Sequence, residues 1–285
     1  MDLDFSKDLN LPVIMSVTRF IPEISASKVA ALIGLNQYQS HHEVMYDLLI
    51  KYEPIKAKIL AIQASERRIP ISKLKYAVLT TPAIKNIVNT GIKICVGLTD
   101  ISDVLKDVER QARVVVNLRH SDLPIEFREV LVSEVCGEVR KKRGLNNENT
   151  ILNTYETDNN VKVEERNTKT FRKEYDNYKL IGRTDGYVAE HKRIVDSKAR
   201  TRWWPEVPMY DEIQLRVYME LSGCLETELI ESFPDGRVRT TKYLNSPEKW
   251  GAIETEIKDA VKKMNIMIEN EDALKKLVYA NTIIV

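Results

Sequence analysis

The sequence predicts a mixed α/β (α+β) fold, in which helices flank a central mixed β-sheet. Three observations support this prediction. Strand-like segments gather between residues 161 and 199, helical patterns precede and follow them, and a strand pair at 228–243 leads into a long helix. Helical patterns around a strand cluster are typical of a sheet whose faces are covered by helices.

The N-terminal part of the chain begins with a predicted helix at about 25–34. Ser25 or Ser27 can cap its first turn, and Gly34 can end it. Helical patterns follow, with a proline-containing link near Pro70. The further helices are expected at 41–63, 81–89, 100–118 and 125–142, and a short apolar strand at 92–98.

Gly144 is expected to interrupt the chain before another helix, which begins near Glu148. We interpret the chain as one domain, 1–285. Its core is expected to comprise about 16–44 and 138–270, and the stretch 45–135 is interpreted as a mostly helical insertion of unknown role.

Strands are predicted at 161–167, 171–176, 179–188 and 192–199. A helix over 207–222 follows, because Ile213, Val217 and Leu221 form one apolar stripe and Gly223 can end it. The next two strands, 228–233 and 237–243, are separated by a Pro-Asp-Gly turn. Ser246 and Pro247 suit the start of a last long helix.

The most informative chemistry lies between Ile181 and Arg200. Side chains two positions apart share one face of a strand, so Asp196 and Lys198 should point the same way and Ser197 the other way. A hairpin would bring Asp185 beside Asp196. Two carboxylates and a lysine suit a hard divalent cation and the water it activates. On this pattern alone, a charged and solvated hairpin is an equally good interpretation.

Asp185 and the run Asp196-Ser197-Lys198 resemble the motif of the PD-(D/E)xK phosphodiesterase superfamily. Thr184 stands where the usual proline would be, and Asp196 is an aspartate where many members carry glutamate. The resemblance implies a restriction-endonuclease-like core. It also implies Mg²⁺ or Mn²⁺, as two ions, held by Asp185, Asp196 and the carbonyl of Ser197, with Lys198 orienting the attacking water.

Glu148 precedes an apolar helix face formed by Ile151, Leu152 and Tyr155. A plain interpretation is an acid in the first turn that complements the helix dipole. The spacing Gly144-x-x-x-Glu148 also resembles the lambda-exonuclease-like nucleases. That resemblance implies that Glu148 completes the metal site.

Gln214 and Tyr218 lie one turn apart on the helix over 207–222. They resemble the Gln-x-x-x-Tyr helix of RecB-like and lambda-exonuclease-like nucleases, which implies a role in holding the active site and the DNA backbone. The alternative is a partly buried Tyr218 beside a solvated Gln214.

The segment from Arg19 to Asn36 resembles the opening of the YqaJ-type viral recombinase nucleases. The resemblance implies that Ser27 and Arg19 bind a terminal 5′-phosphate, and helix N-termini suit phosphates. An ordinary helix cap is the alternative for Ser27.

The net charge of +1 gives no overall attraction to a polyanion, so DNA binding requires local clusters of positive charge. One cluster is 140–143, and another spans Lys179 to Trp204, where seven basic residues face three acids. Arg200 and Arg202 are predicted to position the DNA backbone without reading bases. Trp203 and Trp204 are interpreted as packing residues rather than as a stacking platform.

The three cysteines, Cys95, Cys136 and Cys224, are too few for an iron–sulfur cluster that needs four thiolates, and their scatter suits a reducing compartment. No apolar run reaches transmembrane length, and the first ten residues are too acidic and polar for a signal peptide. An intracellular protein is expected, in the cytoplasm or nucleus, including those of a virus-infected cell, without a membrane partner.

Together the resemblances imply a metal-dependent DNA exonuclease, sequence-independent and acting 5′→3′ on duplex ends in viral or phage recombination or replication. A single-strand annealing protein and further copies of the chain are implied partners. Two alternatives stay open, namely a RecB-like or restriction-type endonuclease of the same fold, and a non-catalytic DNA-binding or scaffold protein.

Overall fold

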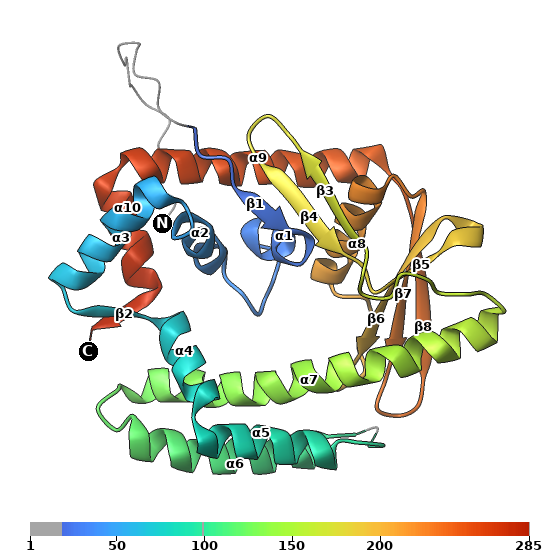
Figure 1. Cartoon of the computed structure of the whole chain (residues 1–285), viewed down its shortest axis with the longest axis horizontal. Helices are drawn as coiled ribbons and strands as arrows, with labels where there is room; N and C mark the ends of the chain where they lie inside the picture. The colour runs from blue at the N-terminus through green and yellow to red at the C-terminus, as the bar shows by residue number, and fades with distance from the viewer. Residues whose placement is uncertain (1–18, 99, 285) are drawn as a thin grey trace.

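The computed structural model describes residues 19–98 and 100–284 as a mixed α/β protein, which confirms the predicted class (Figure 1). Its helices are α1 (Ala26–Leu32), α2 (His41–Leu49), α3 (Glu53–Ser65), α4 (Ile71–Thr80), α5 (Pro82–Ile94), α6 (Ser102–Arg119), α7 (Ile125–Asn159), the short 3₁₀ helix η1 (Ala189–His191), α8 (Met209–Ser222), α9 (Pro247–Glu269) and α10 (Glu271–Ala280). Its strands are β1 (Glu23–Ser25), β2 (Arg68–Pro70), β3 (Thr170–Glu174), β4 (Lys179–Arg183), β5 (Gly186–Val188), β6 (Arg193–Ala199), β7 (Glu226–Ser232), β8 (Val238–Leu244) and β9 (Thr282–Ile284).

Apart from the pair β2-β9, the described strands form two sheets instead of one continuous central sheet. In the first, β4 lies between the parallel strand β1 and the antiparallel strand β3. The second has the order β5-β6-β7-β8, with β6 and β7 parallel and both outer pairs antiparallel. The chain passes from one sheet to the other through Thr184 and Asp185, so the break falls at a predicted site residue.

The largest hydrophobic core joins the first sheet to the helices α1, α2, α3, α8, α9 and α10. Helix α1 packs against α8 and β4, and α9 runs along the same body (Figure 1). Leu180 of β4 and Val261 of α9 are fully buried in this core. Burying a side chain of this size contributes roughly 1.5–3 kcal/mol, so this core anchors the strand that leads to Asp185.

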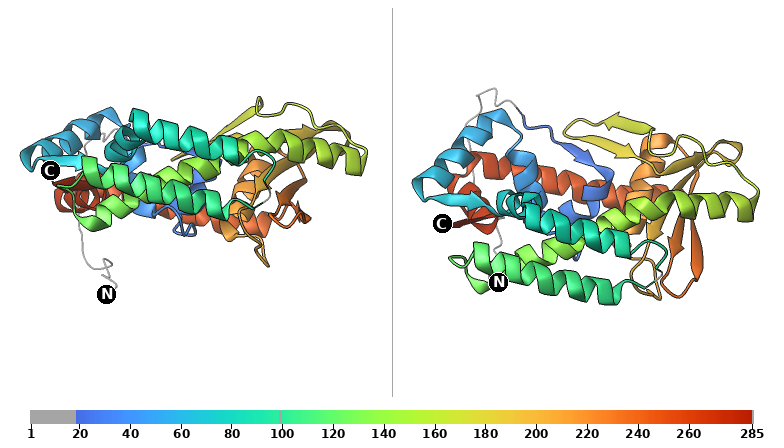
Figure 2. Two further views of the ribbon diagram at one scale, coloured as in Figure 1. Left: turned by 90° about the horizontal axis from the view of Figure 1, so that it is seen from below. Right: turned by 60° about the horizontal axis from the view of Figure 1, so that its bottom comes forward.

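A second core lies within α4, α5, α6 and the first half of α7. Helices α5, α6 and α7 lie side by side as a helical bundle (Figure 2). Helices α2 and α3, which lie within or overlap the predicted insertion 45–135, belong to the largest core and not to the second. Strand β2 pairs with β9, which also places Ile283 in the second core; neither the pairing nor helix α4 was predicted.

Helix α7 is continuous over 35 residues, so the break expected at Gly144 is wrong. At 1.5 Å per residue the helix is about 52 Å long. Glycine inside a helix costs about 1 kcal/mol relative to alanine, but both halves of α7 are buried. The first half packs in the second core, and Leu152 and Tyr155 pack against Val195 and Ile230 beneath the second sheet.

Two predicted strands are also wrong. Residues 92–98 begin as the end of α5, whose buried face includes Ile84, Val88 and Gly91 at helical spacing. Within 161–167 only Glu164 pairs with a strand, because Glu165 and Asn167 adopt left-handed backbone angles that end an extended segment.

Several other predicted boundaries are confirmed. Helix α8 ends at Gly223, which has a φ of 71° and donates its N–H to the carbonyl of Met219. Gly34, with a φ of 78°, follows α1, and Gly236 lies in the turn between β7 and β8. Over the part of the chain that is described, no helix combines the length and apolarity that a membrane crossing requires.

Candidate active site

The hairpin of β5 and β6 places Asp185 opposite Asp196, as predicted. Gly186 pairs with Val195 in this antiparallel hairpin. Asp185, which precedes Gly186, therefore faces Asp196, which follows Val195. The carboxylate of Asp185 accepts hydrogen bonds from the backbone N–H of Ser197 at 2.8 Å and from its hydroxyl at 3.2 Å. The side chain of Ser197 thus also reaches Asp185, which simple alternation along the strand did not predict.

Asp196 and Lys198 share one face of β6, and their charged groups touch. Lys198 Nζ lies 2.8 Å from Asp196 Oδ2, and the two side chains are 27% and 2% exposed. The other oxygen, Asp196 Oδ1, is buried without a hydrogen-bond partner among the described residues. Buried polar atoms in folded proteins nearly always have a hydrogen-bond partner. This oxygen is therefore able to accept a hydrogen bond or to bind a cation.

Burial, together with neighbouring acids, disfavours the ionised form of Asp185. Burial raises the pKa of Asp185 to about 7; the neighbouring Asp196 also raises it, and Glu148 adds a smaller push in the same direction. The ammonium of Lys198 and the N–H of Ser197 only partly oppose this. A cation near these carboxylates would relieve the same repulsion.

Lys198 remains a cation in this environment. Burial works to lower the pKa of Lys198, but Asp196, Asp211 and Asp185 together outweigh it and raise the pKa above its usual value. A lysine held in the protonated form can donate hydrogen bonds and neutralise negative charge, but it cannot accept a proton from water. Lys198 therefore places a positive charge beside Asp196.

Glu148 belongs to α7 and lies at the edge of the pair formed by Asp185 and Asp196. It is 8% exposed and accepts a hydrogen bond from the side-chain amide of Asn167. The backbone N–H of Asn167 donates to the carbonyl of Asp185 at 3.2 Å, so this residue links both acids. Asn167 was not identified from the sequence, because it lies in an irregular segment with no motif.

The three acids do not converge on a single point. Across residues 19–98 and 100–284, no three His, Cys, Asp or Glu side chains are arranged to hold one metal ion. The pair formed by Asp185 and Asp196 is close and crowded, whereas the carboxylate of Glu148 is engaged by Asn167. The carboxylates that crowd each other are thus those of Asp185 and Asp196.

Gln214 and Tyr218 share a face of α8, as predicted, and act as a chain of donors. Gln214 Nε2 donates to the hydroxyl of Tyr218 at 2.7 Å, and that hydroxyl donates to the carbonyl of Arg183 at 2.8 Å. The ring of Tyr218 also packs on Gly182, where an added Cβ would lie 2.9 Å from it. Tyr218 is buried, which corrects its predicted contact with DNA. It instead fixes the connection that carries Asp185.

Arg200 also differs from its predicted role. Its guanidinium lies 2.7 Å from Asp211 and 2.6 Å from Glu231, and these side chains are 9%, 3% and 0% exposed. A cation that is enclosed and neutralised in this way is not available to a DNA phosphate. Arg200 ties β6 to β7 and to the start of α8. Neither Asp211 nor Glu231 was identified from the sequence as a partner of Arg200.

Arg202, by contrast, is exposed in the loop after β6. Its guanidinium lies over the ring of Trp204 at 4.0 Å. Trp203 packs against Phe233 with ring centroids 4.5 Å apart, in agreement with its interpretation as a packing residue. Of the two arginines expected to contact DNA here, only Arg202 presents its charge to solvent.

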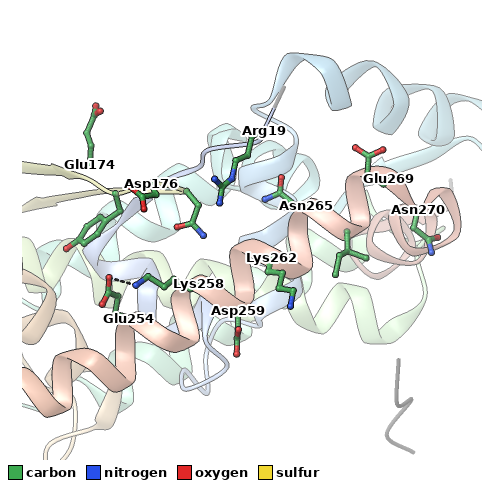
Figure 3. Close-up of a pocket in the computed structure, with 13 residues that line it drawn as sticks. Arg19, Glu174, Asp176, Glu254, Lys258, Asp259, Lys262, Asn265, Glu269 and Asn270 are labelled. Atoms are coloured by element: carbon green, nitrogen blue, oxygen red, sulfur yellow. Dashed lines mark ion pairs between the residues drawn. The ribbon is translucent and has the colours of Figure 1, made fainter. Parts of the chain in front are cut away.

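Arg19 and Ser27 lie in different surroundings. Arg19 lines a cleft of about 1410 Å³ with Asp176 and with Lys262 of α9 (Figure 3). Ser27 is exposed in the first turn of α1, directly after β1, whose Ser25 pairs with Ile181 of β4. The described lining of the cleft does not include Ser27, so the structure does not join the two residues in one phosphate site.

Comparisons with known proteins give partial structural similarities. No protein-family model matches the chain, and no curated protein sequence matches it. An alkaline exonuclease from Laribacter hongkongensis matches with a TM-score of 0.39 and 15% identity, over 46% of this chain and 71% of that chain. In complex with dAMP, the Laribacter exonuclease matches with a TM-score of 0.38 and 14% identity, over 55% and 88%. A phage-related exonuclease from Haemophilus somnus 129PT gives 0.37 and 16%, over 46% and 72%. We therefore base the function on the geometry of the site.

Asp185→Asn should change how the protein responds to pH and to Mn²⁺. Because the folded-state pKa of Asp185 lies above its usual value of about 3.9, the folded protein in chelator binds the extra proton. Its stability should therefore fall as the pH rises from about 4 to about 7. The variant should lack this component and lose most of the rise in Tm caused by Mn²⁺.

Thermal denaturation in chelator and in Mn²⁺ measures both effects. Asp176→Asn, which changes an exposed acid in the turn between β3 and β4, is the matched control. A Mn²⁺-dependent rise in Tm that survives in Asp185→Asn would remove this carboxylate from the cation site.

Proposed function

We propose that this protein is a metal-dependent deoxyribonuclease that hydrolyses phosphodiester bonds as an exonuclease on duplex ends. One observation carries the proposal. The unsatisfied oxygen of buried Asp196 stands beside the crowded carboxylate of Asp185, with the protonated amine of Lys198 at the same place. Two adjacent carboxylates and a protonated lysine suit the hydrolysis of a phosphate ester, because the transition state of that reaction gains negative charge.

The residues present fit a hard divalent cation. Asp185, Asp196 and the carbonyl of Ser197 offer oxygen donors, which Mg²⁺ and Mn²⁺ prefer. Glu148 would join them, for a second ion, once its carboxylate leaves the amide of Asn167. When bound, such a cation lowers the pKa of a coordinated water and offsets charge on the phosphate.

The side chains of the protein supply positioning and charge. Lys198 donates hydrogen bonds to the attacking water or to a phosphate oxygen and stabilises the developing negative charge. Arg200 holds Asp211 and Glu231, which fixes the end of β6 and thereby the direction of Lys198. Tyr218 holds the carbonyl of Arg183 and so keeps Asp185 opposite Asp196.

The finer parts of the proposal rest on the sequence resemblances. These parts are 5′→3′ polarity, recognition of a 5′-phosphate by Ser27 and Arg19, cleavage without sequence preference, and a role in viral or phage recombination or replication. An intracellular location, a single-strand annealing partner and a homo-oligomer belong to the same proposal.

The decisive test is incubation of linear and circular duplex DNA with the protein in Mg²⁺, in Mn²⁺ or in chelator. We expect loss of the linear form alone, only with a divalent cation, and faster when the ends carry 5′-phosphate than 5′-hydroxyl. Opening of the circle would instead indicate an endonuclease. A gel shift of both forms without cutting in either metal would indicate a DNA-binding scaffold and contradict the proposal.

A further inference from the structure

A cleft of about 300 Å³ lies where the helical bundle meets the loop that follows β6. Three cations from three elements line it, namely Lys106 of α6, Arg140 of α7 and Arg202 of the loop. Ser102 and Thr201 add two hydroxyl groups to the same lining. Besides Glu148 of α7, the bundle therefore contributes positive charge to a space next to the strand that carries Lys198.

The net charge of the residues that line the cleft is positive even when the acidic residue is included. The lining acid is Glu109, and its carboxylate is engaged 2.8 Å from Arg113. Within the described residues, the exposed guanidiniums of Arg140 and Arg202 have no carboxylate within ion-pair distance. Lys106 contacts Asp103 at 2.9 Å. That pair is almost fully solvated, so it hardly neutralises the lysine.

The position of the cleft relative to the site follows from α7. Arg140 precedes Glu148 by eight residues on this continuous helix, which places the two about 12 Å apart along its axis. Arg202 follows Lys198 by four residues. For a duplex that runs along α7, this distance of about 12 Å corresponds to about three to four base pairs, since duplex DNA rises about 3.4 Å per base pair.

The surface of α7 between these points is open. Gly144 lies one turn before Glu148, and a Cβ added there would meet no atom within 4 Å. The burial of Val139 and Leu152 on either side holds the helix in place. A glycine at this point leaves the surface low, which lets a nucleic-acid backbone approach the helix closely.

We propose that this cleft binds a backbone phosphate of the DNA substrate, about three to four nucleotides from the scissile bond. The inference rests on the proposed function for its choice of ligand. Arg140 and Arg202 donate charge-assisted hydrogen bonds to the phosphate oxygens, while Lys106 adds a point charge. The bundle of α5, α6 and α7 is thus one wall of the substrate path.

The test measures binding of a 20-base-pair duplex to the full chain by fluorescence anisotropy in chelator, so that nothing is cut. Arg140→Ala should raise the Kd by about tenfold, independently of base sequence. It should also reduce the slope of log Kd against log salt by about one. Lys85→Ala, which removes an exposed cation of α5 outside the cleft, should change neither value.

The two proposals fail in different ways. Suppose that the protein cuts DNA with Mg²⁺ while Arg140→Ala binds the duplex like the unchanged protein. In that case the cleft is not a phosphate site, and the proposed nuclease function is retained. If Arg140→Ala weakens binding but the unchanged protein never cuts, the cleft stands and the nuclease fails. Equal weakening by Lys85→Ala would overturn the cleft as a specific site.

Discussion

Replacing Lys198 with alanine is expected to lower the rate of DNA cleavage by about a hundredfold to a thousandfold, the usual effect of removing one preorganised donor from a transition state. The physical reason is the position of the ammonium. It is 2.8 Å from Asp196 and is held in its protonated form by three surrounding carboxylates. No other described lysine or arginine pairs with Asp196, so nothing replaces this charge.

Gel-based cleavage of linear duplex DNA in Mg²⁺ measures the effect, and the duplex Kd in chelator checks that binding is kept. Circular dichroism with Mn²⁺ present should show an intact fold, since a bound cation offsets the charge that Lys198 balanced. Lys173→Ala is the matched control, because Lys173 also pairs with a carboxylate, Glu220, but on the first sheet. Cleavage by Lys198→Ala within about threefold of the unchanged protein would exclude an electrostatic role for the amine.

Replacing Arg200 with methionine is expected to lower the free energy of unfolding by about 3–5 kcal/mol, the range found when one partner of a buried ion pair is removed. Asp211, 3% exposed, would then lose its ion pair, and Glu231, 0% exposed, would keep only its pair with Arg239. Cleavage should fall as well, because Arg200 fixes the end of β6 that carries Lys198.

Urea denaturation measures the loss. Arg239→Met is the matched control, because Arg239 pairs with the same Glu231 but is 19% exposed, so its removal should cost less. Asp211→Asn added to Arg200→Met should recover part of the stability, since Asp211 is the acid that loses its ion pair with Arg200. A cost below about 1 kcal/mol for Arg200→Met would show that the buried acids find other partners.

Local patterns determined much of the second sheet and its chemistry. The alternation of side chains along 193–199 placed Asp196 and Lys198 on one face, and the turn before it placed Asp185 opposite Asp196. Gly223 ended α8 as expected. Each of these features depends on residues only a few positions apart, whose geometry follows from backbone periodicity and capping.

The tertiary structure decided which of the candidate residues face solvent. Arg200 and Tyr218 match surface-contact roles by motif, yet segments distant in the chain cover them and use their polar atoms. Helix α7 continues through Gly144 although glycine has a low helix propensity, because the two halves of α7 are buried in two separate cores. Asn167 joins Glu148 to Asp185 without any sequence signal. The burial of a side chain and the partners of its polar atoms depend on segments that are distant in the sequence. The pattern of residues within a short window therefore cannot predict them.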